Sequence, residues 1–189
     1  MKRIGLAIVF AISLVALFAC ATSGGDGGTP RQFRIVDSGA LFERGNANAA
    51  RGNHDAAIAD FTEVIRLQPD NEVAYFNRGN SHFDKGNYVA AIADYTEAIR
   101  LDPNFMIAYF CRGDAHAEMV NDDLAIADYT EAIRLDPNFV DAYINRGGLH
   151  LEGENFDLAI ADLEAALRID PNNANARKGL EIVRQEMAR

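Results

Sequence analysis

Three histidines have the residue type and regular spacing that raise the question of a metal site. His82, His116 and His150 recur at one fixed interval along the chain. Each ligand of one zinc ion must lie about 2.1 Å from it, whereas equivalent side chains on successive packed helices are separated by about 8–10 Å. No cysteine or clustered carboxylate completes a ligand set. The sequence therefore predicts structural histidines and no metal site.

The other reactive residue types do not form a catalytic arrangement. Serine and threonine are few, no glycine-rich phosphate loop lies between a strand and a helix pattern, and no Ser/His/Asp set is indicated. The pair Asp122 and Asp123 is explained better as the negatively charged first turn of a helix than as an acid–base pair. We predict a protein that is not an enzyme, has no catalytic residues and needs no cofactor.

A strict period organises the elements that position these residues. The same short sequence motif ends in a proline and recurs at the interval that separates the three histidines. Its prolines are Pro69, Pro103, Pro137 and Pro171. A period of about 34 residues is typical of helix–turn–helix repeats, and a single unit of this kind cannot bury its apolar face without a neighbour. The units run over residues 38–71, 72–105, 106–139 and 140–173.

Small and aromatic residues recur at fixed places in these units. The first half of each unit holds one of Gly45, Gly79, Gly113 and Gly147, and the second half holds one of Ala57, Ala91, Ala125 and Ala159. These small residues are expected to face each other, so that the two helices can approach closely. An aromatic place follows with Phe61, Tyr95 and Tyr129, from which Leu163 departs. The pattern resembles the tetratricopeptide repeat. This resemblance implies an all-α helix–turn–helix solenoid of four repeats, and residues 174–189 are expected to form a C-terminal capping helix.

The predicted helix ends agree with this periodicity. Asn53, Asn87, Asn121 and Asn155 each precede a helical pattern and are expected to N-cap the second helix of each unit. Arg66, Arg100, Arg134 and Arg168 lie in the last turn, where the helix dipole favours cations, and the prolines then stop the helix.

Residues 1–19 have the pattern of a bacterial lipoprotein signal peptide. A charged start, Met1 to Arg3, precedes an apolar run that is shorter than the ~20 residues of a membrane span. The run ends at Cys20, in a sequence that resembles a lipobox, which implies lipidation of that cysteine. An uncleaved anchor and ordinary secretion are the alternatives. Residues 20–37 then form a glycine-rich tether. Ala21 resembles the sorting residue of lipoproteins of the outer membrane, so we expect a periplasm-facing protein of the bacterial envelope.

The charge of the chain excludes two classes of partner. The formal net charge is −10, whereas nucleic-acid binding needs a basic stripe and electrostatic adhesion to anionic lipid needs basic clusters. We expect no nucleic-acid partner, and contact with a membrane only through the lipid. If Cys20 carries lipid, Cys111 has no disulfide partner and is expected to be a small buried residue.

By resemblance, the second, fifth, ninth and twelfth places of each unit line a concave groove. The groove is then expected to bind an extended peptide or an amphipathic helix, although the phenylalanines can instead belong to the core between units. A clamp for acidic tails is not expected, because lysines of that clamp are replaced by phenylalanines. The predicted partner-binding residues are Phe42, Asn46, Val73, Phe76, Asn80, Phe83, Ile107, Phe110, Asp114 and Ile144.

Two further series keep the same period without exception. Arginine recurs at Arg44, Arg78, Arg112 and Arg146, and aspartate recurs at Asp60, Asp94, Asp128 and Asp162. We predict that each arginine pairs with an aspartate of its own or the adjacent unit through charge-assisted hydrogen bonds. The alternative is two rows of independent solvated charges.

Together these features favour a protein–protein interaction adaptor that is tethered in the bacterial envelope and binds other envelope proteins. The alternative function is an accessory lipoprotein that binds or helps transport a small apolar ligand. A co-purifying polypeptide favours the first hypothesis, and a bound small molecule favours the second.

Overall fold

The computed structural model describes residues 37–188, which contain nine α-helices and no strand. The predicted signal peptide, Cys20 and nearly all of the tether lie outside the described residues. No helix of the described part is long and apolar enough to cross a membrane. The helices are α1 (Ser38–Ala50), α2 (His54–Leu67), α3 (Glu72–Asp84), α4 (Tyr88–Leu101), α5 (Met106–Glu118), α6 (Asp122–Leu135), α7 (Val140–Glu152), α8 (Phe156–Ile169) and α9 (Ala174–Met187).

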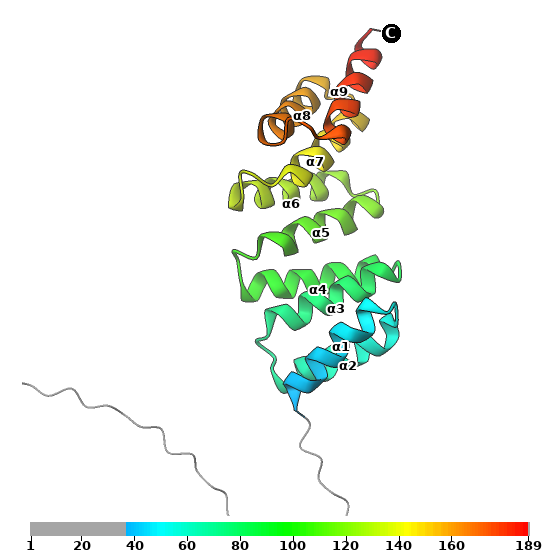
Figure 1. Cartoon of the computed structure of the whole chain (residues 1–189), viewed down its shortest axis with the longest axis vertical. Helices are drawn as coiled ribbons and strands as arrows, with labels where there is room; N and C mark the ends of the chain where they lie inside the picture. The colour runs from blue at the N-terminus through cyan, green and yellow to red at the C-terminus, as the bar shows by residue number, and fades with distance from the viewer. Residues whose placement is uncertain (1–36, 189) are drawn as a thin grey trace, which may run out of the picture. The chain divides into compact units, whose positions relative to one another are not determined.

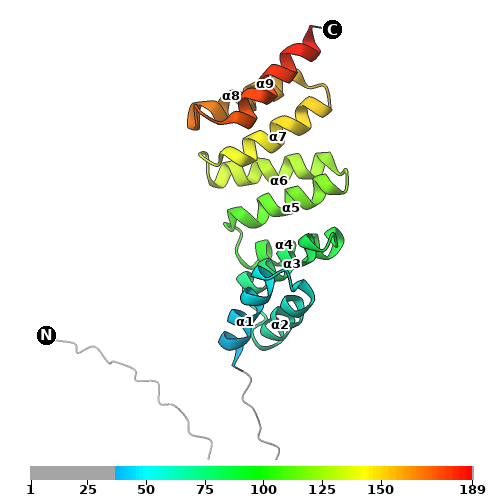
Figure 2. The ribbon, with the colours of Figure 1, turned by 45° about the vertical axis from the view of Figure 1, so that its right-hand side comes forward.

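The helices stack in chain order as antiparallel pairs, from α1 and α2 at one end to α9 at the other (Figures 1 and 2). The chain is therefore an all-α helical-repeat solenoid, as predicted. The last helix has no partner that follows it, and it packs on α8 through Ala176, Leu180 and Val183 around Leu163. Those residues lie on one stripe of α9, which buries its apolar side and leaves a polar one to solvent.

A glycine in the first helix lets the two helices of each pair approach closely. A Cβ atom at Gly79 would lie 2.7 Å from the ring of Tyr95, and one at Gly113 would lie 2.8 Å from the ring of Tyr129. We expected the glycines to face the alanines of the second helix. This expectation is corrected: in the first three units the atoms nearest to such a Cβ belong to the aromatic ring of the second helix, which fills the space beside the glycine.

The second helices begin at the predicted asparagines, but not for the predicted reason. None of Asn53, Asn87, Asn121 and Asn155 makes a side-chain cap hydrogen bond. The residue before each asparagine has a positive φ, at Gly52, Gly86, Val120 and Glu154. This left-handed residue ends the preceding first helix, since the backbone N–H of each asparagine donates back to a carbonyl of that helix. The arginines in the last turns are where the sequence placed them, and three of them also pair with a glutamate one turn earlier.

The predicted Arg–Asp pairs form in all four units, and each joins the two helices of one unit. Arg112 donates from Nε to Asp128 Oδ2 over 2.9 Å and from Nη2 to Asp128 Oδ1 over 2.7 Å. The same two-bond geometry joins Arg78 to Asp94 and Arg146 to Asp162. Such pairs of parallel charge-assisted bonds fix orientation as well as adding stability.

The internal pairs also reach the preceding unit. Arg112 Nη1 donates to Thr96 Oγ1 over 3.1 Å, and the guanidinium lies 5.5 Å from the ring centre of Tyr109. Arg44, in the first unit, bonds to Asp60, and within residues 37–188 no repeat unit precedes it. Its side chain is 64% exposed, against 19% for Arg112. The internal pairs therefore connect neighbouring units, and the first pair does not.

Candidate functional site

The first helices of units two, three and four form the walls of two adjoining hollows. The smaller, of about 270 Å³, is lined by Asn80, Phe83, Asp84, Tyr95, Cys111 and Asp114. The larger, of about 540 Å³, is lined by Phe83, Asp114, Ala117, Glu118, Tyr129, Ile144, Asn145, Gly148, Leu149 and Glu152. Phe83 and Asp114 line both hollows. We call the two together the first-helix groove.

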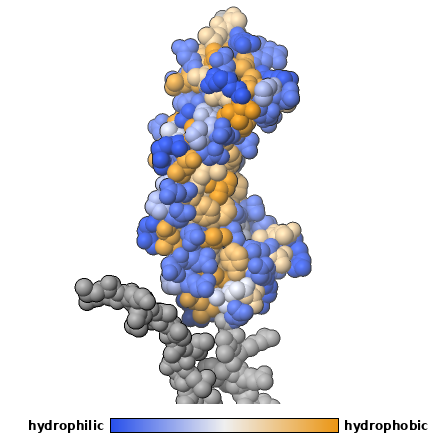
Figure 3. Space-filling model, turned by 60° about the vertical axis from the view of Figure 1, so that its left-hand side comes forward, coloured by the Kyte–Doolittle hydropathy of each residue, from blue (hydrophilic) through white to orange (hydrophobic). Residues whose placement is uncertain are grey.

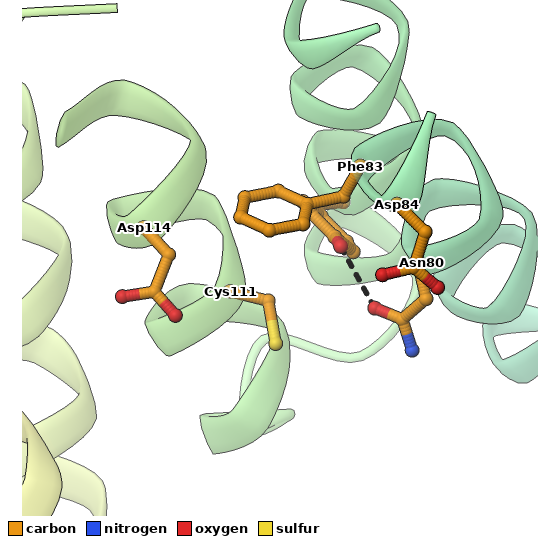
Figure 4. A pocket seen from close by; sticks show the side chains of 6 residues that line it. Asn80, Phe83, Asp84, Cys111 and Asp114 are labelled. Carbon is orange, nitrogen blue, oxygen red and sulfur yellow. Dashed lines mark hydrogen bonds between the residues drawn. The ribbon is translucent and has the colours of Figure 1, made fainter. Parts of the chain in front are cut away.

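The close-up of the smaller hollow shows how α3 and α5 contribute to it. The ring of Phe83 projects from α3 toward α5, where Cys111 and Asp114 lie (Figure 4). The ring packs on Tyr88 at the start of α4, with 5.2 Å between ring centres. Phe83 is half-buried, so one side of the ring is held in place by packing while it also lines the hollow.

The polar residues of the groove are fixed by hydrogen bonds from the core. Tyr95 donates its hydroxyl to Asn80 Oδ1 over 2.7 Å, and Tyr129 donates to Asp114 Oδ1 over 2.7 Å. Asn145, from the next unit, also donates to Asp114 Oδ1 over 3.0 Å. Since Tyr95 and Tyr129 are buried, they stay protonated donors, and burial raises the pKa of both. The amide of Asn80 and the carboxylate of Asp114 therefore have set orientations.

Cys111 interrupts a ladder of amides that links the units. Asn77 donates to Asn46 over 2.9 Å, and Asn145 donates to Asp114, but the equivalent residue between them is Cys111. The thiol is half-buried and lines the smaller hollow, so the prediction of a small buried residue is only partly right. Burial raises the pKa of Cys111 to about 12. The thiol is therefore protonated near neutral pH and is not a reactive thiolate.

Asp114 is the one carboxylate held inside the groove by buried groups. Burial raises the pKa of Asp114, the hydrogen bonds from Tyr129 and Asn145 lower it, and the negative charges of Asp141 and Glu118 raise it further. The net direction is upward. A cation placed beside this carboxylate would stabilise its charged form.

Four of the predicted partner-binding residues come together in the first-helix groove: Asn80, Phe83, Asp114 and Ile144. Phe42 and Val73 line a separate hollow of about 510 Å³ between α1 and α3. Asn46 is half-buried and bonded to Asn77, and Ile107 is half-buried outside the two hollows.

Phe76 and Phe110 do not line the first-helix groove. The ring of Phe76 lies 5.0 Å from that of Phe105 and 5.8 Å from that of Tyr95, between ring centres. Phe110 packs in the same way on Phe139 and Tyr129. Both are half-buried. A role of these two residues in partner binding stays a prediction, beside the alternative that they belong to the core between units.

Sequence reasoning missed the acidic residues of the groove. Asp84, Glu118 and Glu152 all line it, and each is the last residue of its first helix. They recur at the same interval as the prolines, so the signal was present in the sequence. The amide of Asn145 was also missed, although its equivalents Asn77 and Cys111 show that this place varies.

The periodic histidines lie beside the Arg–Asp pairs rather than in the groove. His82, His116 and His150 each hold Nε2 3.9–4.0 Å from the aspartate of their own unit, which is too long for a hydrogen bond. Burial lowers the pKa of His82 and His116. Within residues 37–188 no three His, Cys, Asp or Glu side chains come together as a metal site.

Comparison with protein families identifies the repeat. A family described as TPR repeat matches residues 45–86 and 79–120, and one described as Tetratricopeptide repeat matches residues 112–174. A search of curated proteins gives no significant match.

Several solved structures have the same fold. A structure of MamA protein is 23% identical, with a TM-score of 0.76, and the match covers 80% of this chain and 82% of that one. The first TPR domain of Spaghetti (RPAP3), bound to the HSP90 peptide SRMEEVD, is 27% identical over 62% of this chain and 94% of its own, with a TM-score of 0.60. YrrB, described as a TPR protein with an unusual peptide-binding site, is 19% identical over 80% of this chain and 78% of its own, with a TM-score of 0.70.

Proposed function

Because this chain belongs to the tetratricopeptide-repeat proteins, we propose that it is a non-enzymatic adaptor that binds a peptide or helix of a partner protein in the first-helix groove. The observation that carries the proposal is the continuity of the groove. Its two hollows share Phe83 and Asp114, so that one elongated occupant can contact α3, α5 and α7 in turn. The peptide bound to the Spaghetti domain and the peptide-binding site of YrrB support this type of function.

The composition of the groove suits a peptide. The oriented amides of Asn80 and Asn145 pair with backbone groups, and Phe83, Ile144 and Leu149 offer apolar contacts. One face of the described residues carries a column of apolar patches between hydrophilic bands (Figure 3). The alternative of a small apolar ligand has less support. The smaller hollow lies below the usual ~300–1,000 Å³ of such sites, and the larger hollow, which is within that range, is lined by carboxylates and an amide as well as by apolar side chains.

We further propose that Cys20 carries the lipid that tethers this adaptor in the bacterial envelope, with the repeats facing the periplasm. The support is the apolar run that ends at Cys20 and the glycine-rich stretch after it. Cys20→Ser is expected to abolish acylation, which intact mass measurement of the detergent-extracted protein reports. A processed and acylated Cys20→Ser protein contradicts this part of the proposal.

Site-specific photocrosslinking tests the adaptor function. A photoreactive amino acid at Ala117, which lines the groove, is expected to capture a polypeptide in the native host. The matched control carries the same group at Ala127, an exposed residue of α6 outside the groove. Capture by Ala117 that Phe83→Ala reduces supports the proposal. Equal capture at both positions, or capture by Ala127 alone, rejects the groove as the binding surface.

A further inference from the structure

A row of acidic residues follows the first-helix groove. Asp84, Glu118 and Glu152 end α3, α5 and α7, and each lines one of the two hollows. Asp114 adds a fourth carboxylate where the hollows meet. Among the described residues, no lysine or arginine lines either hollow. The surface that the adaptor offers to a partner is therefore negatively charged along its length.

Helix stability does not explain why acidic residues occupy these positions. The C-terminus of a helix carries the negative end of its dipole, so an acid in the last position weakens the helix and a base strengthens it. The second helices follow the rule, with Arg66, Arg100, Arg134 and Arg168 in their last turns. The first helices of units two to four break it at the same place each time. A local rule that is broken repeatedly, on one surface only, is typical of a functional constraint.

The acids of the row also lack cationic partners within the described residues. Glu118 accepts a hydrogen bond from the hydroxyl of Tyr88 over 3.2 Å, and no ion pair involving Glu118 or Glu152 is present in the described part. Asp84 lies 3.6 Å from His54 Nδ1, which is a charged contact only when that histidine is protonated. By contrast, the glutamates at the equivalent place in α2, α4 and α6, which are Glu63, Glu97 and Glu131, are each paired with an arginine.

We propose that the occupant of the first-helix groove is a cationic peptide segment in which lysine or arginine alternates with apolar residues. Its cations face Glu118, Glu152 and Asp114, while its apolar side chains contact Phe83, Ile144 and Leu149. This inference rests on the proposed function and names the chemistry of the partner. An acidic segment is disfavoured because like charges meet in the groove. The SRMEEVD peptide of the Spaghetti domain, with three acids in its last four residues, has the opposite character.

Two synthetic peptides and two pairs of substitutions test the inference. The labelled peptides KLKFKLKF and ELEFELEF share their apolar residues and differ in charge. The groove variant is Glu118→Gln with Glu152→Gln. The control variant is Glu164→Gln with Glu181→Gln, which removes the same charge from exposed residues of α8 and α9 outside the groove. Binding is measured by fluorescence anisotropy at low and at high salt, with circular dichroism to verify folding.

We expect KLKFKLKF to bind at least about tenfold more tightly than ELEFELEF at low salt. The groove variant is expected to lose roughly five- to tenfold of that affinity and most of its salt dependence, whereas the control variant changes by less than about twofold. Equal affinity of the two peptides, or equal losses in the two variants, overturns the inference.

A third substitution separates this inference from the proposed function. If Phe83→Ala weakens both peptides equally while neither peptide is preferred, the groove binds peptides and only the charge inference is wrong. If Phe83→Ala changes neither peptide's affinity, the groove itself is not the binding surface.

Discussion

The Arg–Asp pairs and the first-helix groove both use residues of the first helices, but they differ in how strictly they repeat. The pairs use the same two residues in every unit. By contrast, one place in the groove changes from unit to unit, from Asn80 to Asp114 to Gly148. Stacking of similar units requires the same contacts at each interface, whereas a partner contacts each unit differently. A first-helix place whose residue changes from unit to unit is therefore a candidate contact for a partner.

The largest expected effect distinguishes an internal Arg–Asp pair from the terminal one. Arg112→Ala leaves Asp128 buried without its guanidinium and also removes the link to Thr96. We expect a loss of about 2–4 kcal/mol in the free energy of unfolding. Arg44→Ala is expected to cost less, because Arg44 is mostly exposed and Asp60 keeps a hydrogen bond from Asn48. Chemical denaturation measures both losses, and equal losses contradict the distinction.

The next effect contrasts two glycines of first helices. A Cβ at Gly113 meets the ring of Tyr129, so Gly113→Ala is expected to destabilise by about 1–3 kcal/mol. At Gly148 a Cβ has nothing within 4 Å. There the substitution to alanine is expected to stabilise by about 0.5–1 kcal/mol, because alanine loses less conformational freedom in a helix. Thermal unfolding compares the two, and a destabilised Gly148→Ala protein means that this part of the groove is closed.

A smaller effect concerns the turns between the paired helices. Val120 has φ 57°, where the equivalent residues of the first two units are Gly52 and Gly86. A β-branched residue is strained in this region. Val120→Gly is expected to raise the stability by about 0.5–1 kcal/mol, and Gly86→Val should lower it. A gain from Gly86→Val would show that the left-handed conformation is not retained.

The smallest effect is a pH dependence within the groove. The folded state raises the pKa of Asp114, so this carboxyl binds its proton more tightly in the folded than in the unfolded protein. Protonation of Asp114 therefore stabilises the folded state at low pH, and this stabilisation is lost as the pH rises through the folded pKa. Asp114→Asn keeps an acceptor for Tyr129 and Asn145 and imitates Asn80. We expect it to be more stable than the parent protein at pH 7, with the gain shrinking as pH falls in a series of denaturation curves.

The histidines provide an opposite control for that series. Burial lowers the pKa of His116, so its contribution is present above the unfolded pKa and is lost as pH falls. The charged groups around it are Asp128 and Arg112. His116→Gln should make the free energy of unfolding fall less steeply below about pH 6.5. It should not change the gain in the free energy of unfolding that Asp114→Asn produces at pH 7. A change in that gain would mean that the two sites are coupled.

The fold was largely predictable because its determinants recur with the period. A glycine in each first helix, an arginine opposite an aspartate and a proline after each second helix are local requirements that every unit must meet. The aspartate of each pair lies 16 residues after its arginine, and two rows with one spacing imply contacts that repeat. The asparagines were right in position and wrong in mechanism, because their side chains make no cap hydrogen bond and the positive-φ residue before each of them ends the preceding helix.

The groove was predictable only in part, because its shape depends on packing that no single unit defines. Phe76 is covered by Phe105, which belongs to the turn that follows α4. Phe83 packs on Tyr88 and still lines the hollow. Family resemblance assigns both residues to the groove, and only the three-dimensional arrangement separates them. The acids of the groove, in contrast, were visible as a row with the same period and could have been found.

The central claim is that the first-helix groove binds a peptide, and chemical-shift mapping tests it most directly. Isotopically labelled protein is titrated with KLKFKLKF, and the backbone amides are followed by NMR. We predict that the largest shifts fall on α3, α5 and α7 around Asn80, Phe83 and Ile144, while α4 and α6 change little. Shifts concentrated on the second helices, with the groove residues unaffected, would contradict the account.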